Sequence, residues 1–528
     1  MAVDSPSQTS VDDAPSADAP AGAQPGLGRA VGHGFSWLSL SFIAGKVLSF
    51  VAQIALGALL SKADFGVFAI ASSVATFAKV FHDGGLAQLL VQRGSDQFRF
   101  LAGPGFWIGI CFSTAAGAVL AAVAPLAAHL YGDPKLTSML WVIALSLPLG
   151  APALVTRAKL RIDLRFRALT IISVISVAIR HLGAIFLAFQ GYGALSFVLP
   201  LLGVAIFEDV AMFVATREKL WNESPNVRAW PELLRSSIWV VATMFFSGFL
   251  LFGDYLVLGL YLDKSVVGQY FFGYQLTTQI AALMWVNLQY VLLPVLSRLA
   301  SDPVRQAAAF IRTIRVLMIV MSAMSLALVV VIEPLEFIVW KQKWAAVIPL
   351  MQIFAIAAPL RALSIVLHAV LMSRGQFRLS AMLTLMEGST LVIAAWLAVK
   401  LYGSNLTGLA AVIGSAQVLF GIVMGAVLVR AWGVSIRVFL QALLPGWALA
   451  TACAGATLLV CSVAGYHEYR VASLIINTAL FGALYVVSLR CFRAADLIEF
   501  LAVAPRSLAE PARRALLLAP RLPADASS

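Results

Sequence analysis

Charged residues are scarce in this sequence. Asp, Glu, Lys and Arg make up 12% of the 528 residues, whereas they make up about 25% of an average soluble domain. A water-soluble protein of this length would have too few charges to cover its surface. The scarcity therefore excludes a soluble globular protein, and the 61% of residues that are hydrophobic must be explained in another way.

Cysteines are few and common catalytic motifs are missing. Cys111, Cys453, Cys461 and Cys491 form no CxxC pair and no zinc-like spacing, so a packing role is indicated. The chain contains no HExxH, no phosphate-cradling GxxxxGKS or GxxxxGKT, and no GxSxG. We therefore expect a protein that is not an enzyme and that binds no metal and no cofactor.

The apolar residues are grouped into runs of about 20 to 28 residues, long enough to cross ~30 Å of hydrocarbon as helices. Short alternating segments typical of membrane β-barrels do not occur. The sequence therefore predicts an all-α polytopic membrane protein with about fourteen transmembrane helices. The predicted spans are 35–60, 64–91, 101–128, 137–156, 168–190, 193–216, 233–261, 265–296, 309–332, 345–373, 379–401, 405–429, 438–464 and 470–491.

The spans divide the chain into segments. Residues 1–34 are rich in Pro, Ala, Ser and Asp and lack the basic start of a signal peptide, so they are predicted to be a disordered cytoplasmic tail. We expect six spans in an N-terminal lobe and six in a C-terminal lobe, followed by two more. The boundaries are 35–216 for the N-lobe, 217–232 for a cytoplasmic linker, 233–429 for the C-lobe, 430–491 for spans thirteen and fourteen, and 492–528 for a cytoplasmic tail.

The basic residues outside the spans are distributed unequally. Of these, 26 lie in the terminal segments and in the loops that follow even-numbered spans, and seven lie in the loops that follow odd-numbered spans. Lys and Arg accumulate on the cytoplasmic side of membrane proteins. The bias predicts that both termini are cytoplasmic, and it explains the net charge of +12 without nucleic acid.

An internal repeat relates the two predicted lobes. LLSKADFGVFAI (59–70) resembles LYLDKSVVGQYFF (260–272), with Gly66 matching Gly268, and 147–166 resembles 358–377, with Pro148 matching Pro359. Six spans separate the copies, and an even number preserves orientation. The repeat therefore predicts two lobes related by a pseudo-two-fold axis along the membrane normal, an arrangement typical of transporters.

Several charged residues lie within predicted spans, where each costs about 2.5–3.5 kcal/mol and none should face lipid. In the first span Ser39, Lys46 and Gln53 recur every seven residues and share one helix face. Similar polar stripes on other spans indicate a shared hydrated cavity. Interhelical ion pairs are the structural alternative, above all for Lys79 with Asp83 and for Glu208 and Asp209. The intramembrane bases are Lys46, Lys79, Arg180 and Arg361, and the acids are Asp83, Glu208, Asp209, Asp254 and Glu387.

The eighth predicted span carries aromatic and amide side chains of the kind that stack on sugars and hydrogen-bond to them. We expect sugar contacts from Tyr270, Tyr274, Gln275, Gln279 and Asn287. Packing between helices through polar residues would produce a similar pattern.

DYLVLGLYLDKSVVGQYFFGYQL (254–276) resembles a signature of bacterial polysaccharide-transport proteins, the Wzx-like oligosaccharide flippases of the multidrug/oligosaccharidyl-lipid/polysaccharide exporter superfamily. LLSKADFGVFAIASS (59–73), GGLAQLLVQR (84–93) and LPVLSRLASD (293–302) resemble its other recurring segments. The resemblance covers about 35–465. It implies two lobes around a cavity that opens alternately to each side of the bacterial inner membrane.

The resemblance implies as cargo an undecaprenyl-diphosphate-linked oligosaccharide for exopolysaccharide, lipopolysaccharide O-antigen or capsule synthesis. Lys46, Lys79, Arg180 and Arg361 would then attract the diphosphate, and Asp83, Asp254 and Glu387 are candidates to carry a coupling H⁺ or Na⁺. Polysaccharide polymerase and assembly proteins are candidate partners. The alternatives are a lipid II flippase, a cation-coupled drug antiporter of the same superfamily, and a membrane polysaccharide polymerase or ligase, which the short external loops disfavour.

Overall fold

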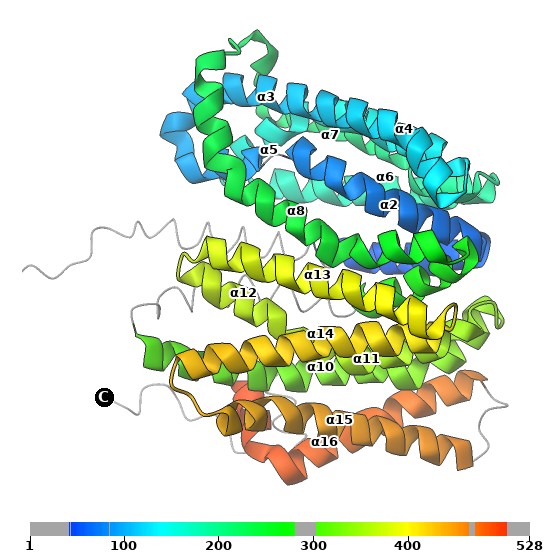
Figure 1. The fold of residues 1–528 in the computed structure, drawn as a ribbon. Coiled ribbons are helices and arrows are strands. Elements are labelled where there is room, and N and C mark those ends of the chain that lie inside the picture. Colours follow the sequence, from blue (N-terminus) through cyan, green and yellow to red (C-terminus); the bar gives the residue numbers. More distant parts are fainter. Residues whose placement is uncertain (1–41, 43, 84, 280–301, 464–469, 504–528) are drawn as a thin grey trace, which may run out of the picture.

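The computed structural model describes residues 42, 44–83, 85–279, 302–463 and 470–503, and every regular element in these ranges is a helix (Figure 1). The residues 44–59 and 264–279 are also helical. The other helices are α2 (Lys62–Asp83), α3 (Leu86–Tyr131), α4 (Lys135–Leu149), α5 (Pro152–Ile162), α6 (Phe166–Phe189), η1 (Gly193–Phe197), α7 (Pro200–Thr216), η2 (Leu220–Asn222), η3 (Val227–Ala229), α8 (Trp230–Tyr261), α10 (Pro303–Trp340), η4 (Ala345–Val347), α11 (Ile348–Arg361), α12 (Leu363–Ser373), α13 (Phe377–Tyr402), α14 (Leu406–Ala431), α15 (Ile436–Val463) and α16 (Arg470–Val503).

The helices agree with the predicted spans. In the described residues, eleven are long and apolar enough to cross a membrane, and the pair α4 and α5, bent by 50°, makes a twelfth. These twelve correspond in order to predicted spans two to seven and nine to fourteen. Predicted spans one and eight extend beyond the described residues, and their described parts, 44–59 and 264–279, are helical. The prediction of an all-α, multi-pass membrane protein is confirmed.

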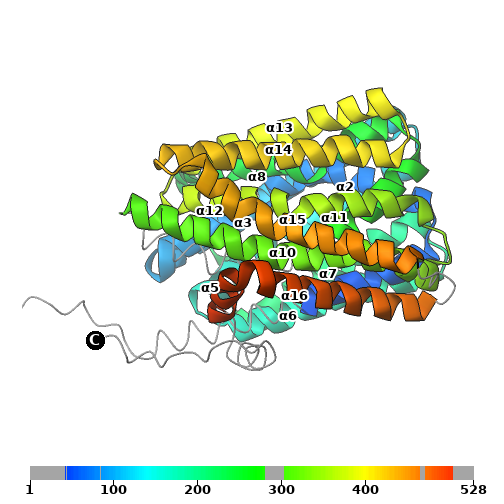
Figure 2. The same ribbon diagram turned by 90° about the horizontal axis from the view of Figure 1, so that it is seen from below.

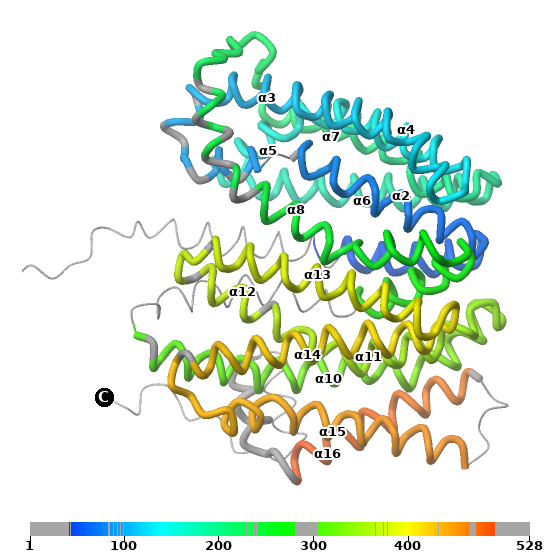
Figure 3. Tube along the Cα trace, viewed as in Figure 1, coloured from blue at the N-terminus to red at the C-terminus, as the bar shows by residue number. Residues whose placement is uncertain are grey.

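The helices form two groups along the chain (Figures 1 and 3). Helices α2 to α7 pack on one another in the blue-to-cyan group, and α10, α11, α13 and α14 pack in the yellow-green-to-orange group. Helix α8 lies between the groups, since it contacts α13 on one side and also α2 and α3. Helices α15 and α16 cover α10, as Figure 2 shows from below.

The buried cores show where the two groups meet. The largest core contains residues of both, among them Leu56, Phe65, Phe272 and Trp344. This shared core lies at the end where 44–59 turns into α2 and α8 turns into 264–279. Two smaller cores lie nearer the other end of the helices. One surrounds Leu363 and Phe439, and another surrounds Leu86, Phe106 and Val155. The groups are thus joined at one end and packed largely separately at the other.

The internal repeat is visible as two broken spans. Helix α4 ends at Leu149, just after Pro148, and α11 ends at Arg361, two residues after Pro359. The turns that follow also match, because Arg165 before α6 has φ −81° and ψ 53° while Gln376 before α13 has φ −83° and ψ 53°. Proline removes a backbone hydrogen bond and bends a helix. The repeat therefore preserves a backbone shape.

Candidate functional site: a basic cavity closed by an interlobe seal

At the shared core, two glycines bring the groups into close backbone contact. A Cβ on Gly66 would lie 1.9 Å from the backbone oxygen of Lys264, and a Cβ on Gly268 would lie 1.8 Å from that of Lys62. Gly66 and Gly268 are matched by the repeat, and so are Lys62 and Lys264. The two contacts are therefore the same contact made in both directions, as a pseudo-two-fold axis requires. No side chain larger than hydrogen fits at either glycine.

Three side chains of the second group hold the last turn of 44–59. Trp340 Nε1 donates to the Ile54 oxygen at 3.0 Å, and Trp344 Nε1 donates to the Gly57 oxygen at 3.0 Å. Lys343 Nζ donates to the oxygens of Ala58 and Leu60 at 3.1 and 2.6 Å. The last carbonyls of a helix lack partners within it, and a cation there complements the helix dipole. We call these contacts, with those of Gly66 and Gly268, the interlobe seal.

A cavity of about 250 Å³ lies next to the seal. Its charged lining side chains are the two bases Lys46, from 44–59, and Arg180, from α6, and the His181 ring lies beside Arg180. The side chains of Lys46 and Gln53 both line it, as their seven-residue spacing predicts. No acidic side chain lines it in the described part of the chain. Its full lining is Lys46, Ser49, Gln53, Leu56, Phe65, Phe68, Arg180, His181, Ala184, Phe197, Phe271, Gln275 and Gln279.

Ser49 fixes the orientation of His181 in this cavity. Ser49 Oγ donates to the Gly45 oxygen at 2.8 Å and lies 2.8 Å from His181 Nε2. A serine hydroxyl has one proton, so His181 Nε2 must donate the second hydrogen bond. Sequence analysis missed both residues. The available signal was their position, three residues after Lys46 and directly after Arg180.

Only some of the remaining candidates from the first eight spans line this cavity. Lys79 on α2 has an exposed side chain that interacts electrostatically with Arg180, although it does not line the cavity itself. The Asp83 side chain and Asn287 lie outside the described part, so their predicted roles stay predictions. Gln275 and Gln279 line the cavity, whereas Tyr270 and Tyr274 do not.

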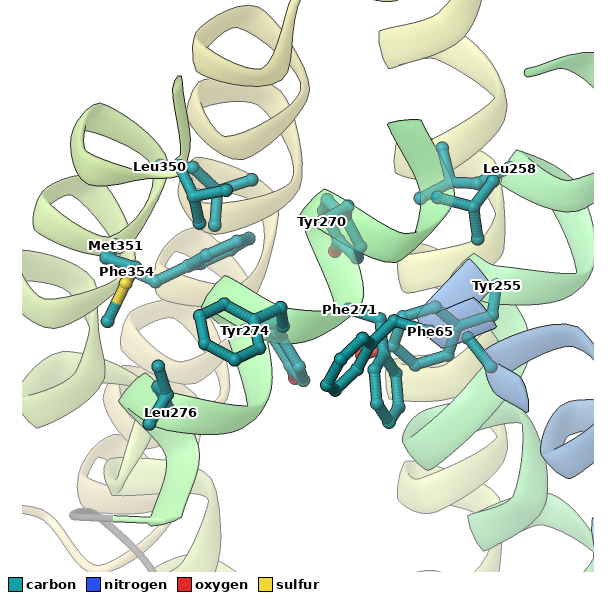
Figure 4. Packing of buried hydrophobic residues seen from close by; sticks show 14 of the residues in the cluster. Phe65, Tyr255, Leu258, Tyr270, Phe271, Tyr274, Leu276, Leu350, Met351 and Phe354 are labelled. Atoms are coloured by element: carbon teal, nitrogen blue, oxygen red, sulfur yellow. The ribbon is translucent and has the colours of Figure 1, made fainter. Parts of the chain in front are cut away.

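Tyr270 and Tyr274 lie among buried hydrophobic side chains (Figure 4), and their hydroxyl and ring contacts belong to a second, polar cluster. Tyr270 donates its hydroxyl proton to Asp254 Oδ2 at 2.9 Å, and the Tyr270 and Tyr274 rings stack with centroids 5.9 Å apart. The Arg361 guanidinium lies 5.3 Å from the centre of the Tyr274 ring. Tyr270 is 0% and Tyr274 6% exposed, so in this conformation neither ring is available to a sugar.

The same cluster continues through α11, α12 and α13. Arg361 interacts electrostatically with Glu387 and Asp254. The Ser364 hydroxyl donates to Glu387 at 2.6 Å. The His368 ring lies 2.8 Å from the backbone oxygen of Ser364 and 3.0 Å from Thr384 Oγ1. Two carboxyl groups and one guanidinium are therefore gathered at the break between α11 and α12. We call these residues, with Tyr270 and Tyr274, the C-lobe cluster.

Glu208 and Asp209 serve as structural partners, one of the two roles considered from the sequence. Glu208 pairs with Arg157 on α5, and Asp209 accepts from the backbone nitrogen of Ala153 at 2.9 Å. Ala153 lies in the first turn of α5, where backbone donors have no partner within the helix. The two acids thus hold α7 against the bent span.

Comparisons with known proteins agree with this architecture. The model of the family described as polysaccharide biosynthesis protein matches residues 55–349. The succinoglycan biosynthesis transport protein ExoT of Rhizobium meliloti (strain 1021) is 22% identical over 331 residues, which are 62% of this chain and 66% of that protein. The chain thus spans slightly less than two thirds of that relative.

Solved structures share the fold. The structure of the lipid II flippase MurJ in an inward closed conformation has a TM-score of 0.67 at 14% identity, covering 86% of this chain and 98% of that one. An inward-facing multidrug resistance MATE family transporter of the MOP superfamily has a TM-score of 0.59 at 13% identity, covering 74% and 95%. At such low identity the likeness shows the fold alone, which this chain shares with these two transporters.

Proposed function

Because this chain belongs to the polysaccharide biosynthesis protein family, we propose that it is a flippase for undecaprenyl-diphosphate-linked oligosaccharides. The product would serve the synthesis of exopolysaccharide, O-antigen or capsule. The observation that carries the proposal is the cavity between the lobes, which is lined by Lys46, Arg180 and His181 and by no described acid.

The charge of the cavity fits a diphosphate. A diphosphate diester carries two negative charges that cannot cross hydrocarbon unaided, and fixed cations within the membrane lower that barrier. Lys46 and Arg180 supply two positive charges, and Lys79 lies within electrostatic reach of Arg180. Gln275 and Gln279 supply hydrogen-bonding groups for the first sugar.

The arrangement of the lobes supports alternating access. We assign the lobes to residues 35–216 and 233–429, with 217–232 as a linker and spans thirteen and fourteen over 430–491. The loop charges put the seal at the periplasmic face of the bacterial inner membrane, with both termini cytoplasmic. In this state the cavity would receive cargo from the cytoplasmic side.

The C-lobe cluster is the candidate coupling site. In the described part of the chain, Asp254 and Glu387 face one cation, Arg361, so two ionised carboxyl groups would leave one negative charge to be neutralised. One H⁺ or one Na⁺ would balance it, and either would give transport a driving ion. The predicted assembly partners, such as a polysaccharide polymerase, belong to the same proposal.

The alternatives within the superfamily differ in the cavity they need. A drug-cation antiporter needs acidic groups facing its cargo, whereas this cavity is basic. A lipid II flippase also moves a diphosphate, so the two flippases can be distinguished only by the sugar headgroup of their cargo.

The test is translocation in proteoliposomes. An impermeant reductant removes the fluorescence of labelled polyprenyl-diphosphate oligosaccharide in the outer leaflet. Lipid that moves from the inner leaflet then becomes accessible, so further loss of fluorescence measures transport. We expect transport of this lipid and none of a fluorescent peptide-bearing lipid II. Equal rates with and without protein would contradict the flippase assignment. Faster transport of lipid II would show that lipid II, and not the oligosaccharide lipid, is the cargo.

A further inference from the structure

Two glutamines form a hydrogen-bonded link between the lobes at the wall of the cavity. Gln279, in 264–279, donates from Nε2 to Oε1 of Gln53 in 44–59. Gln53 Nε2 in turn donates to the backbone oxygen of Phe272 at 3.2 Å. Both glutamines line the cavity, so this link is in reach of whatever occupies it.

The network fixes how each amide is oriented. The Phe272 oxygen only accepts, so Gln53 must present its NH₂ to it and its oxygen to Gln279. Gln279 must therefore donate, and its own Oε1 points elsewhere. That oxygen is buried and has no hydrogen-bond partner in the described part of the chain. A buried amide oxygen without a partner costs free energy, and a ligand hydroxyl would remove that cost.

The link also touches the seal. Gln53 directly precedes Ile54, whose oxygen accepts from Trp340, and it lies one turn before Gly57, whose oxygen accepts from Trp344. The Phe272 ring stacks on Trp344 with centroids 3.9 Å apart. A change in the Gln53–Gln279 contact therefore reaches the seal by two routes. One runs along the backbone from Gln53 to Ile54, and the other runs through Phe272 to Trp344.

We propose that a hydroxyl of the sugar next to the diphosphate binds Gln279 Oε1, draws this amide away from Gln53, and so loosens the interlobe seal. The inference rests on the proposed function and adds to it a coupling step. Empty cavities keep the amide link and stay sealed, whereas an occupied cavity exchanges the interlobe bond for a bond to cargo. A ligand shifts a conformational equilibrium only through such differential contacts.

The seal can be followed without a transport assay. Leu60, 3% exposed at the seal, is replaced by cysteine in a full-length chain whose Cys111, Cys453, Cys461 and Cys491 are serine. Labelling by a soluble maleimide in lipid nanodiscs, open to both faces, then reports how often the seal opens. Gln279→Met keeps the length of the side chain and removes the link, so labelling should rise about fivefold, as expected for the loss of one hydrogen bond.

Thr278→Val is the matched control, since Thr278 precedes Gln279 on the same helix and its hydroxyl donates within that helix, to the backbone oxygens of Tyr274 and Gln275. It should leave the labelling of the empty protein unchanged. Gln53→Met is the second variant, and combining it with Gln279→Met should add less than the sum of the single effects because both remove one bond. Equal labelling in all variants would overturn the proposal.

The ligand arm uses undecaprenyl diphosphate with and without one N-acetylglucosamine, with binding measured in the same samples. We expect both lipids to bind and only the sugar-bearing one to accelerate labelling, an effect that Gln279→Met abolishes. Binding of both lipids with no acceleration overturns this inference and leaves the flippase proposal standing. Failure of either lipid to bind contradicts the proposed function itself.

Discussion

The two lobes share a backbone plan and differ in their charges. At the break of the bent span, the N-lobe holds Gly150 and the C-lobe holds Arg361, although the repeat aligns these positions. Conversely, the positions that align with Lys46 and Arg180 in the C-lobe are Gly248 and Leu391. The N-lobe thus faces the cavity with unbalanced bases, whereas the C-lobe surrounds its base with acids and tyrosines.

This difference separates the backbone features that the two lobes share from the charges that they do not. The glycines of the seal and the prolines at the two helix breaks are repeated because both lobes need the same backbone approach and the same end of a helix. The charges of the two lobes are not repeated. We infer that the N-lobe bases hold the anionic cargo and that the C-lobe cluster responds to an ion.

The largest effect on the protein should come from Arg361→Gln, which tests whether the charges of the C-lobe cluster compensate one another, unlike the bases of the N-lobe. It removes the cation that interacts electrostatically with the buried Asp254 and Glu387. Leaving a buried charge without compensation costs about 3–5 kcal/mol. We expect much lower protein abundance in the membrane, measured by quantitative immunoblot.

The additional change Glu387→Gln should restore abundance in the Arg361→Gln background, because charge and partner are then removed together. Arg180→Gln is the comparison in the other lobe and should accumulate normally. If Arg361→Gln accumulates like the unchanged protein, the C-lobe cluster is not a compensated charge cluster.

Gly66→Ala tests the symmetric part of the comparison. The added methyl group would meet the Lys264 backbone, which cannot move aside as a side chain can, so the sealed state should lose about 1–3 kcal/mol. Faster maleimide labelling of a cysteine at Leu60 measures this loss, and Gly268→Ala should match it.

Gly455→Ala is the control for these glycines, since a Cβ there meets nothing within 4 Å. A pseudo-two-fold seal requires similar effects at Gly66 and Gly268 and none at Gly455. An effect at one seal glycine alone would break the symmetry argument.

The smallest effect should come from Lys343→Met, which removes the two hydrogen bonds to the oxygens of Ala58 and Leu60. Part of that loss is regained from water because Lys343 is only half-buried, so about 1 kcal/mol is expected. Lys341→Met changes an exposed lysine of the same turn and should have no effect on labelling. Equal labelling of the two variants would remove Lys343 from the seal.

The fold could be predicted from the sequence because each span must be apolar and long enough to cross the hydrocarbon, and because basic residues gather in the cytoplasmic loops. The repeat also predicted that Gly66 and Gly268 occupy equivalent places. The site was predicted only in part. Seven-residue spacing grouped Lys46 with Gln53, yet spacing within one helix cannot show which other helix it faces.

For that reason the sequence grouped Arg361 with Lys46 and Tyr270 with Gln279, and the structure separates both pairs. Tyr270 and Gln279 lie on one helix but on different faces, one toward Asp254 and one toward Gln53. The seal donors Trp340, Lys343 and Trp344 were missed because their partners are backbone oxygens nearly 300 residues away, which leave no pattern in the side chains.

The central claim is that the bases of the N-lobe bind the diphosphate of the cargo, and binding of undecaprenyl diphosphate to purified protein in nanodiscs tests it most directly. Each charged hydrogen bond contributes about 1.5–3 kcal/mol, so Lys46→Gln and Arg180→Gln should each weaken binding about 10- to 100-fold without lowering the melting temperature. Undecaprenyl monophosphate, with less charge, should bind more weakly to the unchanged protein and lose less in the variants. Equal affinity of the unchanged protein and both variants for the diphosphate would contradict the account.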